Sequence, residues 1–228
     1  MELRRTANAG VLLKLDGVTI LMDGVCREVK PYPATPPEVK EELKANMPDA
    51  VAFTHAHKDH YDPGFAAYFL QKNGVILGPS DCHGSMEPRT VGKVRITPVS
   101  SRHIGAAGKM IAHASFIIEG SLCVWFTGDA APAQWRQHSF PKPDVLIVPY
   151  AYCNTASAWA ATKKLGSKTV VLVHMPKSEE EAVDLWSSVK ETTGYPCEPA
   201  CEGNKSGISP DLYIPDMNET VLIQLPRD

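Results

Sequence analysis

The chain has 228 residues, of which 43% are apolar and 21% are charged, and its formal net charge is −3 at pH 7. It is long enough to bury a sizeable core, and no apolar run approaches the roughly 18 residues of a membrane helix. The weak negative charge excludes a general electrostatic attraction to nucleic acid or anionic membranes. The N-terminal residues show no small-residue cleavage site, so we expect a cytoplasmic protein without a membrane partner.

The first predicted elements are a β-hairpin and a helix. Two apolar runs, 11–15 and 18–22, flank an Asp-Gly pair at 16–17, which is typical of a tight turn between antiparallel strands. Thr35 is followed by two prolines and then by Glu38. This order supplies a capping hydroxyl, a proline in the first turn and an acid three residues after the cap, so it predicts a helix that begins there.

The rest of the chain is predicted to alternate helices with short strands. After an apolar strand at 50–53, Asp62-Pro63 predicts a helix that runs to about residue 72. Further apolar runs predict strands at 75–77, 94–98, 115–118, 122–126, 145–148, 169–173 and 220–224. Residues 178–181 form a capping box with an acidic first turn, which predicts a third helix that runs to about residue 191.

A repeated plan relates the two halves of the chain. Residues 17–24 and 120–129 each begin with a turn glycine, continue as an apolar strand and end on an Asp beside a Gly. Two related α/β halves packed sheet to sheet would produce this repeat. No low-complexity segment or obvious linker separates them, so we predict a single domain over residues 1–228.

Four side chains that can bind metal fall within six residues, directly after the strand predicted at 50–53. They are His55, His57, Asp59 and His60. Several imidazoles at this spacing are hard to explain as ordinary core or surface histidines, whereas imidazole nitrogens and a carboxylate suit Zn²⁺ and its first-row neighbours. A turn after a strand can aim His55 and His57 at one ion, and Asp59 and His60 at a second. Hydroxide held between two such ions is a strong nucleophile at neutral pH.

This segment resembles the HxHxDH signature of the metallo-β-lactamase superfamily, and further motifs resemble the family's pattern, in order, from about residue 8 to residue 175. Asp23 resembles an early aspartate that orients ligand histidines. His103 resembles the third histidine of the first metal site, and Asp129 resembles the carboxylate that bridges the metals. His174 resembles the last ligand of the second site. The resemblance implies two divalent metal ions, with Zn²⁺ favoured and Mn²⁺ or Fe²⁺ left open, bound by His55, His57, Asp59, His60, His103, Asp129 and His174.

The resemblance also implies a fold. We expect an αββα four-layer sandwich, in which two mixed β-sheets are flanked by helices and the metal site lies at one edge, where strand ends converge. The compact length and the motifs around His103 and Asp129 look nearest to the branch that contains ascorbate-phosphate lactonase and uncharacterised metal-dependent hydrolases.

Two assignments stay open. His113 could replace His103 as a ligand, because the loop at 104–112 is longer and richer in Gly and Ala than the short HTPGH pattern of relatives. Cys197 and Cys201 could form a disulfide or bind metal, although no second Cys/His pair lies near them in the sequence.

The resemblance implies a hydrolase whose catalytic group includes Asp59 and His174. Asp59 is expected to orient the attacking hydroxide and to return a proton to the leaving oxygen. Tyrosine hydroxyls after the strand at 145–148 could donate hydrogen bonds to the oxyanion, and nearby polar groups could bind a phosphate, carboxylate or other polar part of the substrate. These candidates are Tyr150 and Tyr152 for catalysis, and Arg102 and Asn154 for substrate binding.

We expect the substrate to be a small ester or lactone, with or without a phosphate group. The main alternative is a phosphodiesterase acting on nucleic acid or a cyclic nucleotide, although no basic patch with interleaved aromatic residues supports a polymer substrate. A further alternative is a mononuclear iron oxidoreductase resembling persulfide dioxygenases, which would use His55, His57, His103 and Asp129 alone. A non-catalytic binding protein is disfavoured by the complete ligand set. The sequence specifies neither the substrate's identity nor the oligomeric state.

Overall fold

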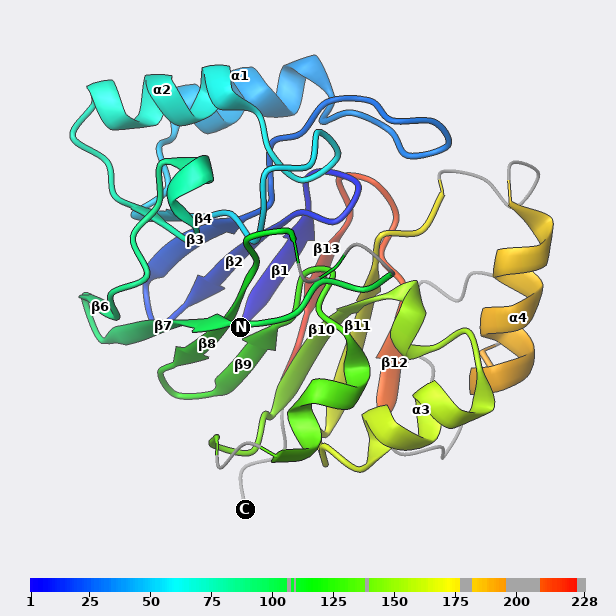
Figure 1. The fold of residues 1–228 in the computed structure, drawn as a ribbon. Coiled ribbons are helices and arrows are strands. Elements are labelled where there is room, and N and C mark those ends of the chain that lie inside the picture. The colour runs from blue at the N-terminus through cyan, green and yellow to red at the C-terminus, as the bar shows by residue number, and fades with distance from the viewer. Residues whose placement is uncertain (106–107, 109, 138–139, 177–181, 196–209, 225–228) are drawn as a thin grey trace.

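Two mixed β-sheets packed face to face between helices make up the computed structural model (Figure 1). It describes residues 1–105, 108, 110–137, 140–176, 182–195 and 210–224. Within these residues, the strand order is β13-β1-β2-β3-β4-β5 in the first sheet and β12-β11-β10-β9-β8-β7-β6 in the second. The αββα sandwich expected from the sequence is therefore confirmed.

The first sheet is antiparallel from β13 to β3 and parallel from β3 to β5. Its strands are β1 (Glu2–Arg5), β2 (Val11–Leu15), β3 (Val18–Met22), β4 (Ala50–Ala52), β5 (Ile76–Leu77) and β13 (Thr220–Leu222). The predicted hairpin is β2–β3. Its turn places Asp16 at φ 52° and Gly17 at φ 80°, the left-handed pair that an Asp-Gly hairpin turn requires.

The second sheet is antiparallel from β6 to β9 and parallel from β9 to β12. Its strands are β6 (Arg89–Val91), β7 (Val94–Ser100), β8 (Ala114–Glu119), β9 (Cys123–Phe126), β10 (Val145–Pro149), β11 (Thr169–Val173) and β12 (Asp211–Tyr213). All the predicted strands are present with ends shifted by at most two residues. The edge strands β6 and β12 were not predicted, because neither three-residue segment carries a run of apolar residues.

Helices cover the outer face of each sheet (Figure 1). They are α1 (Pro37–Ala45) and α2 (Pro63–Gln71) on the first sheet, and α3 (Ala156–Lys163) and α4 (Val183–Thr193) on the second. Short 3-10 turns follow at η1 (Ser80–Cys82), η2 (Pro132–Gln137) and η3 (Tyr150–Tyr152). No helix in the described part of the chain is long and apolar enough to span a bilayer.

Two details of the helices differ from the sequence predictions, and a third prediction is not tested. Thr35 does not cap α1: Pro36 is the N-cap residue, and the Thr35 hydroxyl instead donates to the Gly24 carbonyl and accepts from the Cys26 amide. The helix α3 was missed, although the Thr155 hydroxyl caps it. The predicted capping box at 178–181 lies outside the described residues, and α4 is described from Val183 onward.

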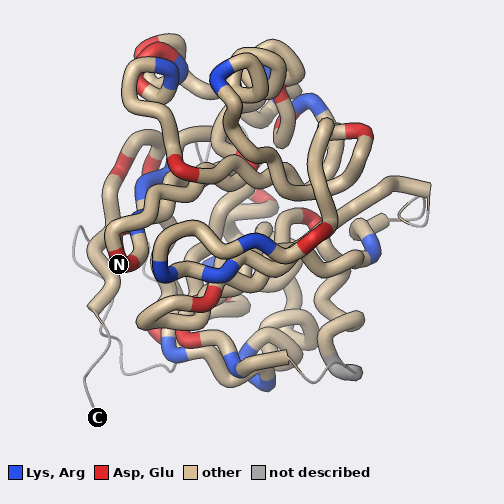
Figure 2. Tube along the Cα trace, turned by 90° about the vertical axis from the view of Figure 1, so that its left-hand side faces the viewer, with Lys and Arg blue, Asp and Glu red and all other residues tan. Residues whose placement is uncertain are grey.

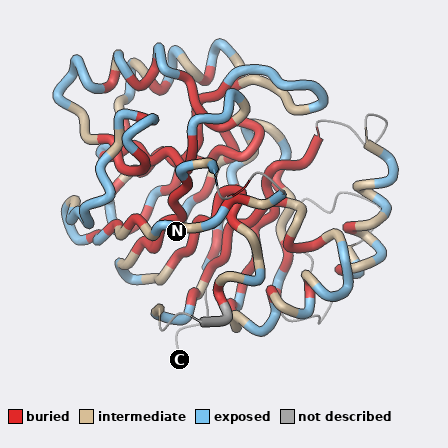
Figure 3. The backbone as a smooth tube through the Cα atoms, in the orientation of Figure 1, coloured by how far each residue is buried: buried red, intermediate tan, exposed pale blue. Residues whose placement is uncertain are grey.

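Apolar side chains fill three layers, and the buried backbone forms a continuous centre (Figure 3). The layer between the sheets contains Leu13 and Ile20 from the first sheet and Phe116 and Phe126 from the second. The other two layers lie beneath the helix pairs. Basic and acidic residues are interspersed over the face shown in Figure 2, in keeping with the small net charge.

The functional residues lie at one edge of this sandwich because of strand direction. Parallel neighbours in a sheet end at the same edge, and loops that follow them bring their side chains together. The strands β3 and β4 are parallel in the first sheet, and β9, β10 and β11 are parallel in the second. The segments that follow β3, β4, β9 and β11 carry Asp23 and all the predicted metal ligands except His103, which follows β7.

Candidate metal centre

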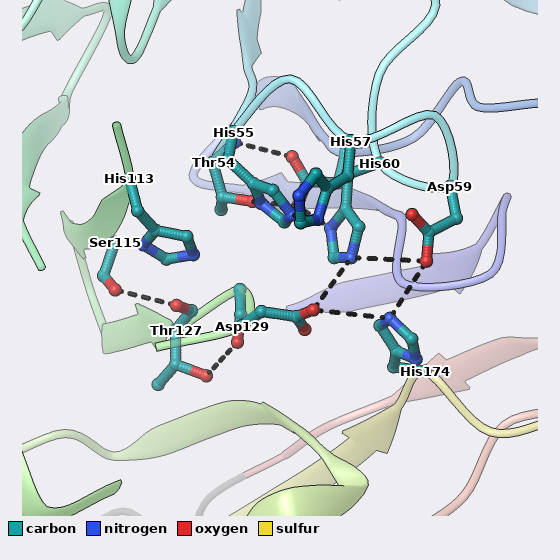
Figure 4. Close-up of polar contacts among 12 residues, drawn as sticks. Thr54, His55, His57, Asp59, His60, His113, Ser115, Thr127, Asp129 and His174 are labelled. Carbon is teal, nitrogen blue, oxygen red and sulfur yellow. Dashed lines mark hydrogen bonds and ion pairs between the residues drawn. The ribbon is translucent and has the colours of Figure 1, made fainter. Parts of the chain in front are cut away.

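The seven predicted metal ligands come together at the edge where β4, β9 and β11 end. Figure 4 shows six of them: His55, His57, Asp59, His60, Asp129 and His174. The turn after β4 carries four of them, and the ends of β9 and β11 carry one each. The seventh, His103, lies in the loop between β7 and β8, where it forms a bridge with Ala130 just after Asp129. This pairing brings a residue from a long loop to the strand ends.

The ligand atoms form three overlapping groups. In each group the atoms lie within 4.8 Å of one another, and the members are His55, His57 and His103; His55, His60 and Asp129; and Asp59, His60 and His174. Asp129 is central, since its Oδ2 lies 3.4 Å from His60 Nε2, 3.5 Å from His174 Nε2 and 3.6 Å from His103 Nε2. Atoms that bind one ion tetrahedrally at about 2.1 Å lie roughly 3.4 Å apart. The spacing therefore suits metal coordination.

Several of these atoms are buried and have no hydrogen-bond partner in the part of the chain that the structure describes. They include His60 Nε2, His103 Nε2 and Asp129 Oδ1. The other ring nitrogens of the two histidines are held, because His60 Nδ1 donates to Asp23 Oδ2 at 2.8 Å and His103 Nδ1 donates to the Ile104 carbonyl at 2.6 Å. An unpaired buried polar atom costs about 1–3 kcal/mol. A bound cation would satisfy all three atoms, so the residues fit a metal.

His55 and His57 also place ring nitrogens close together. His55 Nδ1 lies 2.9 Å from the Thr54 hydroxyl, and its Nε2 lies 2.9 Å from His57 Nδ1. Because the Thr54 hydroxyl donates to Asp23, His55 Nδ1 must be the donor in its own contact with that hydroxyl. The Nε2 lone pair is then free to face His57 and an ion between them.

Asp23 accepts hydrogen bonds that position two of the candidate ligand histidines. Its side chain is completely buried. Its Oδ1 accepts from the Thr54 amide at 2.7 Å, and its Oδ2 accepts from the Thr54 hydroxyl at 2.6 Å and from His60. Asp23 therefore contacts one ligand histidine directly and a second through Thr54.

The charges of the centre are strongly coupled. Burial, followed by the charge on His60, holds the pKa of His55 well below its ordinary value, so His55 is a neutral ligand at pH 7. Burial alone would raise the pKa of Asp129, but His174 and His60 outweigh it and hold that pKa well below the usual range. Burial would lower the pKa of His60, but Asp129 and Asp23 raise it well above 6.5. The carboxylates thus attract positive charge, which a metal ion would supply.

His113, the alternative ligand, takes part in a different contact. Its Nδ1 lies 2.7 Å from the Ser101 hydroxyl, which also contacts the Ser115 hydroxyl. Its ring centroid is 5.1 Å from that of His55, and burial lowers its pKa to about 3. Among the described residues, His103 belongs to a ligand group and His113 does not. The geometry therefore favours His103 as the ligand.

The structure places some of the predicted substrate-contact residues beside the centre and others away from it. The ring of Tyr150 lies 5.8 Å from that of His174, beside the centre. Tyr152 is not on the rim as expected: it is fully buried, and its hydroxyl accepts from Trp135 Nε1 at 2.7 Å. Arg102 is exposed next to His103, and Asn154 is half-buried. Cys197 and Cys201 lie outside the described residues.

Tyr32 is a residue at the centre that the sequence did not indicate. Its ring contacts the ring of His174 edge-on, with the centroids 4.4 Å apart. Burial raises the pKa of Tyr32, and so do a hydrogen bond with Tyr150 and the charges of Asp129 and Asp59. No motif marks this position, because Tyr32 lies in the long segment between β3 and α1 and reaches the centre only through the fold.

Comparison with known proteins bears on the family and the fold of the chain. The family model described as the β-lactamase superfamily domain matches residues 2–174. An isothiocyanate hydrolase from Delia radicum gut bacteria has a similar structure, with a TM-score of 0.68 and 18% identity over 99% of this chain and 100% of that one. Igni18, a metallo hydrolase from Ignicoccus hospitalis KIN4/I, gives 0.65 and 17% over 99% of each chain. CmlA, a diiron β-hydroxylase from Streptomyces venezuelae, gives 0.63 and 13% over 97% of this chain and 54% of that one. No curated protein sequence matches the chain.

Proposed function

Because the chain belongs to the metallo-β-lactamase superfamily, we propose that it is a binuclear metal-dependent hydrolase. The observation that carries the proposal is the position of Asp129. One of its oxygens lies 3.4–3.6 Å from the Nε2 atoms of His60, His103 and His174. Of these histidines, His103 belongs to one ligand group, and His60 and His174 share another. A carboxylate shared between groups is suited to bridge two ions.

The ligand groups divide between the two ions. His55, His57 and His103 would hold one ion, and Asp59, His60 and His174 would hold the other, with Asp129 common to both. Such ions lower the pKa of water and polarise a substrate oxygen. We favour zinc, because imidazole nitrogens with a minority of carboxylate oxygens are typical zinc ligands.

Residues near His174 are proposed to accept a proton and to donate hydrogen bonds to an oxygen atom of the substrate. Burial raises the pKa of Asp59, but His174 outweighs burial and lowers it, so the carboxylate is ionised and can accept a proton at neutral pH. Tyr32 keeps its phenolic proton, because its pKa is raised, and it can donate a hydrogen bond. Tyr150 lies close enough to share that role.

These groups support a small ester or lactone as the substrate class. The two phenols are neutral donors, which suit a carbonyl oxygen better than a highly charged polymer. Arg102, exposed beside His103, offers a position for a phosphate or carboxylate on the same substrate. Asn154 is a weaker candidate for the same purpose.

The test begins with the metal content of protein purified without added metal or chelator, measured by elemental analysis for the wild type and for Asp129→Ala. The wild type is expected to hold about two zinc ions per chain. Asp129→Ala is expected to lose at least one ion and about 100-fold or more in kcat/KM, since a shared ligand contributes several kcal/mol to transition-state stabilisation. Glu41→Ala is the matched control, because Glu41 is an exposed acid on α1.

Activity is then screened on simple esters and lactones, on bis-p-nitrophenyl phosphate and on isothiocyanates, the last because of the structural relative that hydrolyses them. Preference for the ester or lactone supports the proposed class. Preference for the phosphodiester would select the phosphodiesterase alternative, and one tightly held iron would select the oxidoreductase. Absence of bound metal in the wild type would contradict the proposal, and so would an Asp129→Ala protein with full metal content and activity.

A further inference from the structure

Arg5, at the end of β1, is buried, and among the described residues its side chain donates only to main-chain carbonyls. Its Nε donates to the Ala7 carbonyl at 3.3 Å, and Nη1 donates to the Pro215 carbonyl at 3.1 Å. Its Nη2 donates to the Asn8 and Met175 carbonyls at 3.0 and 2.9 Å. The side chain makes no ion pair with a described residue. Buried arginines are normally paired with a carboxylate, so this one needs another explanation.

The charge of Arg5 persists in spite of burial. Burial lowers its pKa to about 10, opposed by the charge of Asp216. The guanidinium is therefore still positive at neutral pH, and its hydrogen bonds to carbonyls are charge-assisted. These bonds join β1 to three segments that are distant in the sequence or turn sharply: the loop after β1, the residues after β11 and the stretch before β13.

The segment after β11 is the one that carries a metal ligand in a strained conformation. His174 has φ 60°, a left-handed backbone that non-glycine residues adopt only when their surroundings enforce it. Its amide donates to the Asn8 carbonyl at 3.0 Å. Arg5 Nη2 contacts that same carbonyl and the carbonyl of the next residue, Met175. A single nitrogen thus joins the two carbonyls that border the His174 turn.

The ring of His174 depends on this backbone more than the rings of His60 and His103 do. His60 and His103 each have the second ring nitrogen fixed by a hydrogen bond, but His174 Nδ1 is buried without a partner among the described residues. Ligand histidines are usually oriented by such a bond. Here the main chain and the edge contact with Tyr32 must hold Nε2 at 3.3 Å from Asp59 Oδ2.

We propose that Arg5 is a positioning residue that holds His174 in place for the metal ion on the side of Asp59 and His60. The inference rests on the proposed two-metal centre and adds to it a residue outside the ligand set. Loss of the guanidinium should release the His174 turn while leaving His55, His57 and His103 in place. The ion bound by those three histidines should then be unaffected, so the two ions should respond differently.

The experiment measures the two stepwise zinc affinities by competition with a chromophoric chelator. For Arg5→Met, one of the two zinc affinities is expected to fall roughly 10- to 100-fold, the range for residues that orient ligands, while the other stays unchanged. Arg5→Lys keeps the charge and a donor, so its affected zinc affinity is expected to lie between those of the wild type and Arg5→Met. Arg4→Met is the matched control, because Arg4 is the neighbouring residue on β1 and pairs with Glu42 on α1 instead.

Val221→Ala separates positioning from general stability. Val221 is a buried residue of β13, the strand paired with β1, so its truncation should lower the unfolding temperature without changing the ratio of the two zinc affinities. An Arg5→Met protein that keeps both affinities, or loses both equally, overturns the inference. If Arg5→Met does not fold, the ratio of the two zinc affinities is measured in Arg5→Lys instead. A ratio equal to that of the wild type would then overturn the inference. If the wild type binds fewer than two zinc ions, the two-metal centre itself fails and the inference fails with it.

Discussion

Asp23 illustrates how one side chain outside the ligand set can control the centre. Its two oxygens accept three hydrogen bonds, two from Thr54 and one from His60. Burial raises the pKa of Asp23, and the hydrogen bond from His60 opposes that effect. The cost of burying this carboxylate is offset by donors on both sides, so its benefit is the fixed orientation of His60 and of the Thr54-His55 segment.

Asp23→Asn is expected to disturb this orientation. An amide has one acceptor oxygen, so it cannot accept from both the Thr54 amide and His60 Nδ1, and its nitrogen would face one of these donors. We expect the zinc affinity to fall roughly 10- to 100-fold, measured by chelator competition. Asp81→Asn, in the turn η1, is the control for a general effect of removing a carboxylate. Unchanged zinc affinity in Asp23→Asn would contradict the assigned role.

The positions of individual tyrosines could not be predicted from the sequence. Tyr150 and Tyr152 are equivalent in the sequence, yet one lies beside His174 and the other is buried with its hydroxyl bonded to Trp135. The turn η3 separates them, because successive residues of a tight helical turn point in different directions. Tyr32 reaches the same centre from the opposite half of the chain.

At the scale of elements, Asp62 connects the turn that carries four of the proposed metal ligands to the two helices of the first sheet. It is the N-cap of α2, where Oδ1 accepts from the Phe65 amide at 2.8 Å. Its Oδ2 accepts from Lys40 on α1 at 2.8 Å. The segment His55–His60 ends two residues earlier, so this cap determines where the turn stops and the helix begins.

Asp62→Ala is expected to cost about 1–2 kcal/mol of stability at pH 7, the range for a lost N-cap, measured by urea unfolding. Burial would raise the pKa of Asp62, but the bonds from Lys40 and Phe65 outweigh it and lower the pKa. A lowered folded-state pKa means that the contribution is present above the unfolded pKa of about 3.9 and is lost as the pH falls through the folded value. The difference between wild type and variant should therefore shrink in strong acid.

The control is Thr155→Ala, which removes the cap of α3. The Thr155 hydroxyl accepts from the Ala158 amide at 3.2 Å and does not ionise in this range, so the cost of this variant should not depend on pH in the same way. A cost of Asp62→Ala that stays constant from pH 7 down to strong acid would show that the ionised carboxylate is not what stabilises the helix.

At the scale of the whole molecule, the two sheets meet at the metal centre through Gly128 and Thr54. Gly128 follows β9 in the second sheet and has φ 51°, and a Cβ at this position would lie 2.7 Å from Thr54 Cβ and 2.8 Å from Thr54 Oγ1. Thr54 follows β4 in the first sheet and bonds Asp23. The Thr54 side chain can pack this closely against the backbone of residue 128 only because that residue has no side chain.

Gly128→Ala is therefore expected to lower both stability and zinc affinity. Overpacking costs about 1–3 kcal/mol, and the displaced Thr54 would disturb Asp23 and His55. Gly17→Ala is the matched control, because Gly17 also has a positive φ, 80°, but has open space around its Cα; it should lose only about 1–2 kcal/mol from backbone strain. Thermal unfolding and chelator competition measure the two effects. Equal zinc affinity in the two variants would contradict the proposed contact.

The sequence by itself indicated the class of fold and a candidate ligand set, because strand and turn patterns are local and the order of the motifs resembles that of a known superfamily. Apolar runs of strand length, the Asp-Gly turn and the spacing from His55 to His60 are visible without knowledge of distant contacts. The tertiary structure alone decided that His103 joins the first ligand group, that Tyr32 borders His174 and Tyr152 does not, and that Arg5 reaches the carbonyls around His174. These facts depend on contacts between segments up to 170 residues apart, which only the packing of the two sheets brings together.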